Sequence, residues 1–205
     1  MTRTSVRFRC QDCGYETTKW LGKCPDCGSW GGLDAPSSAS GAGATARPVP
    51  LADVDTTGMP RRPTLLPELD RVLAGGLVPG SVTLIGGEPG VGKSTLLLQA
   101  LGAMAAAGAR CLLVCAEESP AQVRMRADRL GVVTPDLLLV AETSLPAIVA
   151  HVADVAPDIL AVDSIQTVHD PDSPGAPGSV SQVRDAAQRL VRLAKEQNVS
   201  TVLVG

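Results

Sequence analysis

Aromatic residues are scarce in this sequence and unevenly placed. The 205 residues include two tryptophans, one tyrosine and one phenylalanine, all within the first 30 positions: Phe8, Tyr15, Trp20 and Trp30. A small unit needs bulky packing residues or a stabilising cross-link, such as a disulfide or a metal site. A longer unit can build its core from Leu, Val, Ile and Ala. The break in composition therefore predicts two units whose cores are built differently.

Long apolar runs and a strong net charge are also missing. No run approaches the roughly 18 residues that a membrane-spanning helix needs. The first residues, MTRTSVRFRC, lack the apolar segment of a secretory signal. We therefore expect a cytoplasmic protein without a membrane segment. The formal net charge of −3 argues against a strongly basic nucleic-acid coat protein, but it leaves a local basic patch possible.

Composition also suggests where the units divide. Residues 34–50 read DAPSSASGAGATARPVP, and they hold almost no large apolar side chain. Such a segment cannot bury a core and is typical of a flexible linker. We predict a small module at 5–33, a linker at 34–50 and a main domain at 51–205.

In the main domain, segments typical of strands alternate with segments typical of helices. The strand-like runs are SVTLIGG, RCLLVCA, DLLLV, DILAVD and STVLVG. Ser119 with Gln122, and Ser179 with Gln182, match the capping box of a helix start, and Ser144 is a further expected cap. Continuous apolar strands that alternate with helices predict an α/β fold, with a parallel sheet covered by helices on both faces.

Four of the six cysteines form a C-x2-C-x10-C-x2-C pattern, in which a glycine follows each pair: Cys10, Cys13, Cys24 and Cys27. Four thiolates suit a closed tetrahedral Zn²⁺ site. A module of about 30 residues is too small to fold on apolar burial alone, so a metal would supply the missing free energy. We predict a zinc ribbon. A disulfide or redox pair is the alternative, which a cytoplasmic setting disfavours.

The remaining features of the ribbon and the other two cysteines point to structural roles. Residues 1–32 hold five Lys or Arg against three Asp or Glu, a mild excess that permits contact with nucleic acid without requiring it. We expect Trp20 and Trp30 to pack the ribbon rather than to stack on bases. Cys111 and Cys115 lie in an apolar strand and are expected in the core.

The segment GGEPGVGKST, at 86–95, matches the phosphate-binding pattern G-x-x-x-x-G-K-[ST] between a strand and a helix. Backbone N–H groups of such a loop face the phosphates of ATP. Lys93 is expected to reach the β- and γ-phosphates, and Ser94 to bind Mg²⁺. The predicted nucleotide-binding residues of this segment are Gly87, Glu88, Pro89, Gly90, Val91, Gly92, Lys93, Ser94 and Thr95.

Carboxylates follow two other predicted strands. Asp163 ends the run ILAVD, and Glu117 and Glu118 follow LLVCA. Sites in parallel sheets form at the carboxyl ends of strands, so we predict that Asp163 helps to hold Mg²⁺ and the nucleotide. One of the two glutamates would activate water. A turn aspartate and a solvated acidic turn are the alternatives, and the arginines of the following helix are expected on a solvated face.

Several long segments together resemble one family. The ribbon, ELDRVLAGGLVPGSVTLIGGEPGVGKSTLLLQ, AEESPAQVRMRADRL and APGSVSQVRDAAQRLVRLAKEQNV are similar to the RadA (Sms) family of bacterial DNA repair proteins. The resemblance implies a RecA-like P-loop ATPase that acts in recombinational repair. It also implies binding to single-stranded and branched DNA, a recombinase partner of the RecA type, and assembly as a homo-hexamer.

The resemblance also suggests roles for single segments. Replicative helicases of the DnaB type carry a strand-end glutamate before M-S-x-x-Q, and matching Ser119 and Gln122 to that pattern puts the catalytic position at Glu117. With Lys93, this residue completes the predicted catalytic pair. The Pro/Gly-rich loop at 169–178 occupies the place of a DNA-binding loop in RecA-like proteins.

The sequence departs from the family most clearly at its end. The family's Lys-Asn-Arg-Phe-Gly motif and Lon-protease-like domain do not follow Gly205, so we expect an incomplete ATPase domain. Two other functions stay open: a nucleotide- and DNA-binding fragment that does not hydrolyse ATP, and a regulatory ATPase of a circadian-clock or signalling type.

Overall fold

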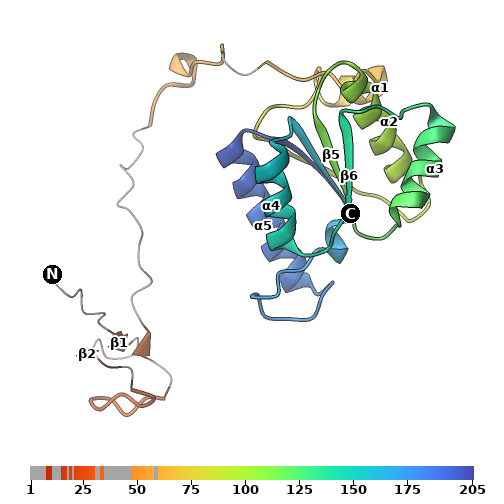
Figure 1. Ribbon diagram of the computed structural model, residues 1–205. Helices are drawn as coiled ribbons and strands as arrows, with labels where there is room; N and C mark the ends of the chain where they lie inside the picture. Colours follow the sequence, from red (N-terminus) through yellow and green to blue (C-terminus); the bar gives the residue numbers. More distant parts are fainter. Residues whose placement is uncertain are drawn as a thin grey trace. The chain divides into compact units, whose positions relative to one another are not determined.

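The computed structural model describes residues 8–10, 15–17, 19, 21–30, 33–34, 48–57 and 60–205. The chain divides into two compact units, Met1–Val54 and Asp55–Gly205 (Figure 1). Most of the predicted linker at 34–50 lies outside the described residues, so the domain boundaries given above stay predictions. Each unit is described by itself.

The first unit is built from short strands. β1 (Phe8–Cys10) pairs antiparallel with β2 (Glu16–Thr17) on one side and with β3 (Leu33–Asp34) on the other. A 3-10 turn, η1 (Leu51–Asp53), lies near the end of this unit. Its described core consists of Cys10 and Cys24, with Phe8 packed against them. So small a core agrees with the expectation that a metal stabilises the unit.

The second unit is an α/β domain with a parallel sheet in the order β4-β8-β7-β5-β6. Its strands are β4 (Val82–Ile85), β5 (Cys111–Cys115), β6 (Leu137–Ala141), β7 (Ile159–Asp163) and β8 (Ser200–Val204). This arrangement confirms the predicted fold class.

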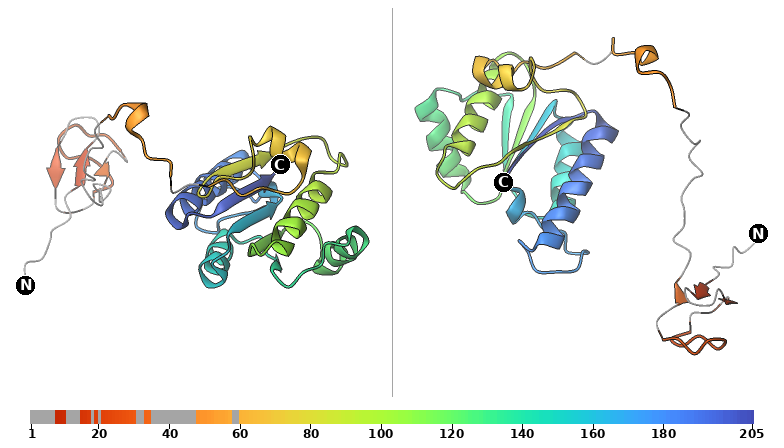
Figure 2. Two further views of the ribbon diagram at one scale, coloured as in Figure 1. Left: turned by 90° about the horizontal axis from the view of Figure 1, so that it is seen from above. Right: turned by 180° about the vertical axis from the view of Figure 1, so that it is seen from behind.

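Five helices and one 3-10 turn accompany the sheet. They are α1 (Pro67–Val72), α2 (Lys93–Ala106), α3 (Pro120–Leu130), α4 (Leu145–Val155), η2 (Ile165–Thr167) and α5 (Val180–Gln197). Figures 1 and 2 show α2 and α3 on one face of the sheet and α4 and α5 on the other.

Alternating side chains of the strands fill two separate cores. In β5, Cys111, Leu113 and Cys115 join the core beneath α2 and α3, whereas Leu112 and Val114 join the core beneath α4 and α5. All five are buried. Because both faces of the strand are covered, the run is apolar throughout instead of alternating with polar residues.

The register of the sheet brings the ends of its strands together. Cys115 of β5 pairs with Asp163 of β7, and Asp163 pairs with Val204 of β8. On the other side of β8, Ile85 of β4 also pairs with Val204. The segments that follow β4, β5 and β7 therefore start at the same edge of the sheet, which positions the candidate site.

The three predicted helix starts differ in how far the expected capping hydrogen bonds form. Ser119 and Gln122 form the complete capping box at α3, as predicted. Ser144 stands at the N-cap of α4, but its side chain makes no capping hydrogen bond. Instead, one carboxylate oxygen of Glu142 accepts the backbone N–H groups of Thr143 and Ser144, each at 2.8 Å.

At α5 only half of the predicted capping box forms. The Ser179 hydroxyl accepts the backbone N–H of Gln182, but the Gln182 side chain turns inward and is 2% exposed. Its Oε1 accepts the N–H of Asp170 at 2.9 Å, and its Nε2 donates to the carbonyls of Asp170, Ser173 and Gly175 at 3.1, 2.7 and 3.3 Å. The prediction failed here because the loop before α5 offers this side chain more partners than its own helix does.

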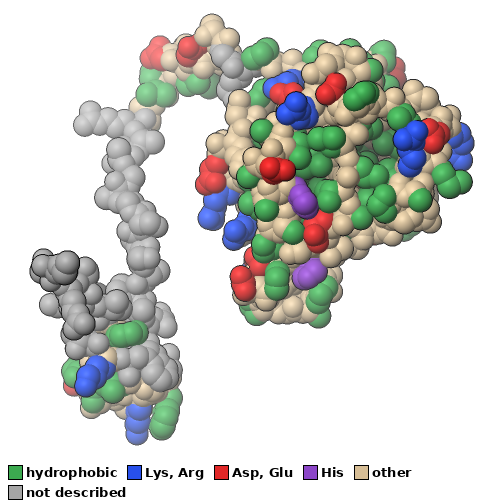
Figure 3. All heavy atoms as spheres, viewed as in Figure 1, with side chains coloured by type: hydrophobic (Ala, Val, Ile, Leu, Met, Phe, Trp, Pro, Cys, Tyr) green, Lys and Arg blue, Asp and Glu red, His purple; other side chains and the backbone are tan. Residues whose placement is uncertain are grey.

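The surface shows charges of both signs. On the face in Figure 3, Lys and Arg side chains are interspersed with Asp and Glu among the described residues. Within those residues, no helix combines the length and the apolar character that crossing a bilayer requires.

The role of Gln182 can be tested by its removal. Gln182→Ala should lower the free energy of unfolding by about 2–4 kcal/mol, because the change leaves buried backbone groups of the loop without partners. Urea denaturation would measure the loss. The matched control is Gln188→Ala on the exposed face of α5, which should stay within about 0.5 kcal/mol of the native chain. Equal effects of the two changes would contradict this assignment.

Candidate nucleotide-binding site

A glycine-rich loop joins β4 to α2 and is exposed. Gly90 and Gly92 have φ of 82° and 101°, a backbone region that glycine adopts without strain. Gly92 is the N-cap of α2, and the first turn of that helix holds no acidic residue. The N-terminal N–H groups of the helix thus offer an anion site at the end of the loop, as the sequence pattern requires.

The side chain of Lys93 folds back onto this loop. Its ammonium donates to the carbonyls of Gly87 and Glu88, at 2.7 and 3.1 Å. The cation therefore lies over the span of backbone where the phosphates of a nucleotide are expected. The contacts agree with a phosphate-binding role for Lys93, which stays a prediction.

Asp163 and Ser94 face each other across the end of the sheet. Both side chains line the same cavity, and the Ser94 hydroxyl is close enough to lower the pKa of the Asp163 carboxyl by hydrogen bonding. Burial raises the pKa of Asp163, and this hydrogen bond opposes the rise. Glu117 and Glu118 raise the same pKa further by charge repulsion, while Arg126 lowers it. A hydroxyl and a carboxylate side by side are oxygen ligands of the type that Mg²⁺ prefers.

The two glutamates after β5 have different partners. The Ser164 hydroxyl donates to Oε1 of Glu117, and the Arg126 guanidinium donates to Oε1 of Glu118. Glu117 is exposed, so water can reach it, whereas Glu118 forms an ion pair with a half-buried arginine. This difference favours Glu117 over Glu118 as the residue that activates water.

The three carboxylates, the Ser94 hydroxyl and the Arg126 guanidinium meet in one cavity. It is lined by Ser94, Leu97, Leu98, Leu113, Cys115, Glu117, Glu118, Val123, Arg126 and Asp163. The predicted magnesium ligands and the predicted catalytic glutamate are therefore neighbours, although they are far apart in the sequence.

Ser164 and Arg126 were missed from the sequence. Arg126 was expected on a solvated face together with Arg124 and Arg129. Its place in the helix offered a signal, since it lies three residues after the buried Val123 and directly before the buried Ala127. The partner of Glu117 had no comparable signal, because only the fold brings residue 164 beside residue 117.

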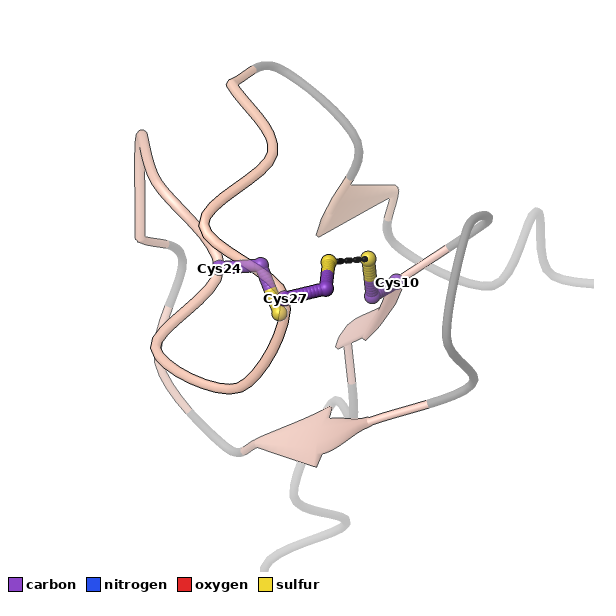
Figure 4. A group of neighbouring side chains, drawn as sticks. All are labelled: Cys10, Cys24 and Cys27. Atoms are coloured by element: carbon purple, nitrogen blue, oxygen red, sulfur yellow. Dashed lines mark hydrogen bonds between the residues drawn. The ribbon is translucent and has the colours of Figure 1, made fainter.

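Three cysteines of the first unit form a candidate metal centre (Figure 4). The sulfur atoms of Cys10, Cys24 and Cys27 all lie within 4.8 Å of one another, and those of Cys10 and Cys27 are 3.7 Å apart. Sulfurs about 2.3 Å from a tetrahedral zinc lie about 3.8 Å from each other, so the arrangement fits the ion. Cys13, the fourth predicted ligand, lies outside the described residues.

The prediction that Trp30 packs the ribbon is wrong. Its side chain is 78% exposed, and the Lys23 ammonium lies 5.6 Å from the centre of its ring. Lys23 and Trp30 pair in an isolated antiparallel bridge, which makes the two residues direct neighbours. Trp20 lies outside the described residues.

The remaining two cysteines are in the core, as predicted. Cys111 and Cys115 are buried, and burial raises the pKa of Cys111 to about 12. Such thiols hold little thiolate at neutral pH, so they suit packing better than reactivity or metal binding.

Comparisons with known proteins agree with both units. Residues 62–139, which include the glycine-rich loop, match the KaiC ATPase family. Residues 8–35 match the rubredoxin metal binding domain. A RecA-like ATPase domain preceded by a metal-binding ribbon is thereby confirmed.

Curated relatives match the whole chain. It is 44% identical to the DNA repair protein RadA of Halalkalibacterium halodurans, 44% to that of Streptococcus pyogenes serotype M1 and 42% to that of Bacillus subtilis, with 100% of the chain covered each time. Over the stretch that it shares with them, the chain belongs to the RadA family. The chain spans about half the length of these relatives, 47% in each case.

The role of Asp163 can be tested by thermal stability, without an assay of ATP hydrolysis. A carboxyl whose pKa is raised in the folded chain favours folding at low pH, and it opposes folding once the pH exceeds the raised pKa. Asp163→Asn should therefore raise the Tm of the nucleotide-free chain at neutral pH by about 2–4 °C. We expect Mg²⁺ and ATP to raise the Tm of the native chain further, and Asp163→Asn should abolish that rise.

Differential scanning calorimetry would measure both effects. The control is Asp172→Asn at an exposed loop position, which should change neither. A nucleotide-free Asp163→Asn chain less stable than the native one would contradict the assignment of a half-buried carboxyl whose pKa is raised by burial.

Proposed function

We propose that this chain forms the ATP-hydrolysing part of a cytoplasmic DNA repair ATPase that acts in recombination. The observation that carries the proposal is the cavity at the carboxyl edge of the sheet. There Ser94, Glu117 and Asp163 meet near the start of α2, whose first residue is Lys93. The identity with RadA proteins over the whole chain supports the role in repair.

Each residue of the site has a separate role in ATP hydrolysis. Lys93 and the N–H groups at the start of α2 bind the β- and γ-phosphates and offset their charge. Glu117 orients a water molecule and accepts its proton as the oxygen bonds to the γ-phosphorus and the bond to ADP breaks. The Ser164 hydroxyl holds the Glu117 carboxylate in place.

Two metal ions fit the residues present. Ser94 and Asp163 would hold Mg²⁺, which neutralises phosphate charge when bound. Zn²⁺ would sit among the cysteines of the first unit and stabilise its fold. The described sulfurs and the Ser94–Asp163 pair have the donor chemistry that each ion takes.

The DNA partners are part of the same proposal. The substrates would be single-stranded and branched DNA, the partner a recombinase of the RecA type, and the assembly a homo-hexamer in which a neighbour supplies a cation to the γ-phosphate. The loop at 169–178 is the candidate DNA contact. It follows η2 and the Glu117 partner Ser164, so DNA at this loop would act close to the catalytic residue.

Two alternatives make different predictions. A nucleotide- and DNA-binding fragment would bind ATP without hydrolysing it. A regulatory ATPase, which the match to the KaiC family keeps open, would hydrolyse ATP without a response to DNA.

Turnover with and without single-stranded DNA tests the proposal. We expect the native chain to hydrolyse ATP faster when DNA is present. Lys93→Ala should bind a fluorescent ATP analogue about 10–100-fold more weakly, because it loses charge-assisted bonds to phosphate, and its turnover should be undetectable. The control is Lys195→Ala, an exposed lysine of α5, which should match the native chain.

The outcome separates the three functions. Native turnover that DNA stimulates supports the proposal. Tight binding with no turnover points to the fragment, and turnover that ignores DNA points to the regulatory ATPase. Either of the last two results would overturn the proposal.

A further inference from the structure

An ion pair joins α3 to the end of β5. The guanidinium of Arg126 donates to Oε1 of Glu118, eight residues earlier in the chain. The two side chains are only 22% and 36% exposed. The pair cannot form within one helix, so it depends on α3 packing beside the strand end.

A second arginine of the same helix forms an ordinary, solvent-exposed ion pair. Arg124 pairs with Asp128 at 3.1 Å, and these side chains are 63% and 55% exposed. Such a surface pair is screened by solvent and contributes little. Figure 3 shows charged side chains of both signs at the place of α3. The pair at Glu118 differs because it lines the cavity that also holds Ser94 and Asp163.

The cavity is crowded with negative charge. Three carboxylates, Glu117, Glu118 and Asp163, all line it. ATP would add the charge of its phosphates to the same space. Charges in a half-buried site interact more strongly than they do in water. The arrangement therefore needs a cation that offsets one of the carboxylates.

We propose that Arg126 is a positioning residue that neutralises Glu118 and holds its carboxylate aside, so that Glu117 alone faces the terminal phosphate of ATP. This inference rests on the proposed function. Without Arg126, Glu118 would be an unpaired carboxylate in the cavity, where it would repel the phosphates. The Ser164 hydroxyl would still hold Glu117.

The test is the binding of a fluorescent ATP analogue in excess Mg²⁺. Arg126→Gln should weaken binding about tenfold, because one carboxylate near the phosphates loses its counter-charge. Arg126→Lys keeps the charge and should recover most of the loss. The double variant E118Q/R126Q has neither charge, and it should bind within about twofold of the native chain.

Arg124→Gln is the matched control, with the same substitution on the same helix, and it should leave binding unchanged. Urea denaturation of every variant distinguishes charge compensation in the site from a merely structural role, since the inference requires Arg126→Gln to lose affinity while it remains folded at the assay temperature. If Arg126→Gln alone does not fold, as judged by urea denaturation, the double variant still decides the matter by its affinity.

Two results would overturn the inference. One is binding by Arg126→Gln equal to that of the native chain. The other is a double variant that binds tenfold more weakly than the native chain does. A native chain that binds no ATP would instead overturn the proposed function, and the inference with it, so the two failures are distinguishable.

Discussion

The parallel pairing of β5 with β7 is the constraint on which the rest of the site depends. Cys115 and Asp163 are partners in register, so the residues that follow β5 meet the end of β7. Glu117 can then accept a hydrogen bond from the Ser164 hydroxyl, and Glu117 and Asp163 can line one cavity. A shift of one residue along either strand would turn these side chains to the opposite face of the sheet.

The two cores fix that register. Side chains of β5 alternate between the core under α2 and α3 and the core under α4 and α5. A shift of the strand register by one residue would turn each set of side chains toward the opposite pair of helices. The first core continues along α2 from Leu97 to Met104, which holds the helix start at the edge of the sheet. The packing that stabilises the domain is therefore the packing that places Lys93 and Ser94.

The sequence predicted features that local rules determine. The α/β alternation, the capping box of Ser119 and Gln122, the glycine-rich loop and the core position of Cys111 all follow from short stretches of chain. Each depends on residues within a few positions of one another. Within the zinc pattern each C-x2-C pair is equally local, and the three described sulfurs agree with the predicted site.

The sequence failed where tertiary contacts compete with local ones. Gln182 left its capping box because the loop before α5 offered it four hydrogen bonds. Arg124 and Arg126 look alike in the sequence, yet only the second lies on the side of α3 that faces the strand end. Trp30 was expected to pack the ribbon, yet its ring is exposed and lies beside the Lys23 ammonium.

The central claim is that groups from three strand ends form one nucleotide site. A crystal structure of the chain with Mg²⁺ and a non-hydrolysable ATP analogue tests it most directly. We predict Mg²⁺ at about 2.0–2.1 Å from the Ser94 hydroxyl, with Asp163 beside it, Lys93 on the phosphates and Glu117 facing the γ-phosphate. A metal held by Glu118, or a nucleotide bound away from the loop at 86–95, would contradict the account.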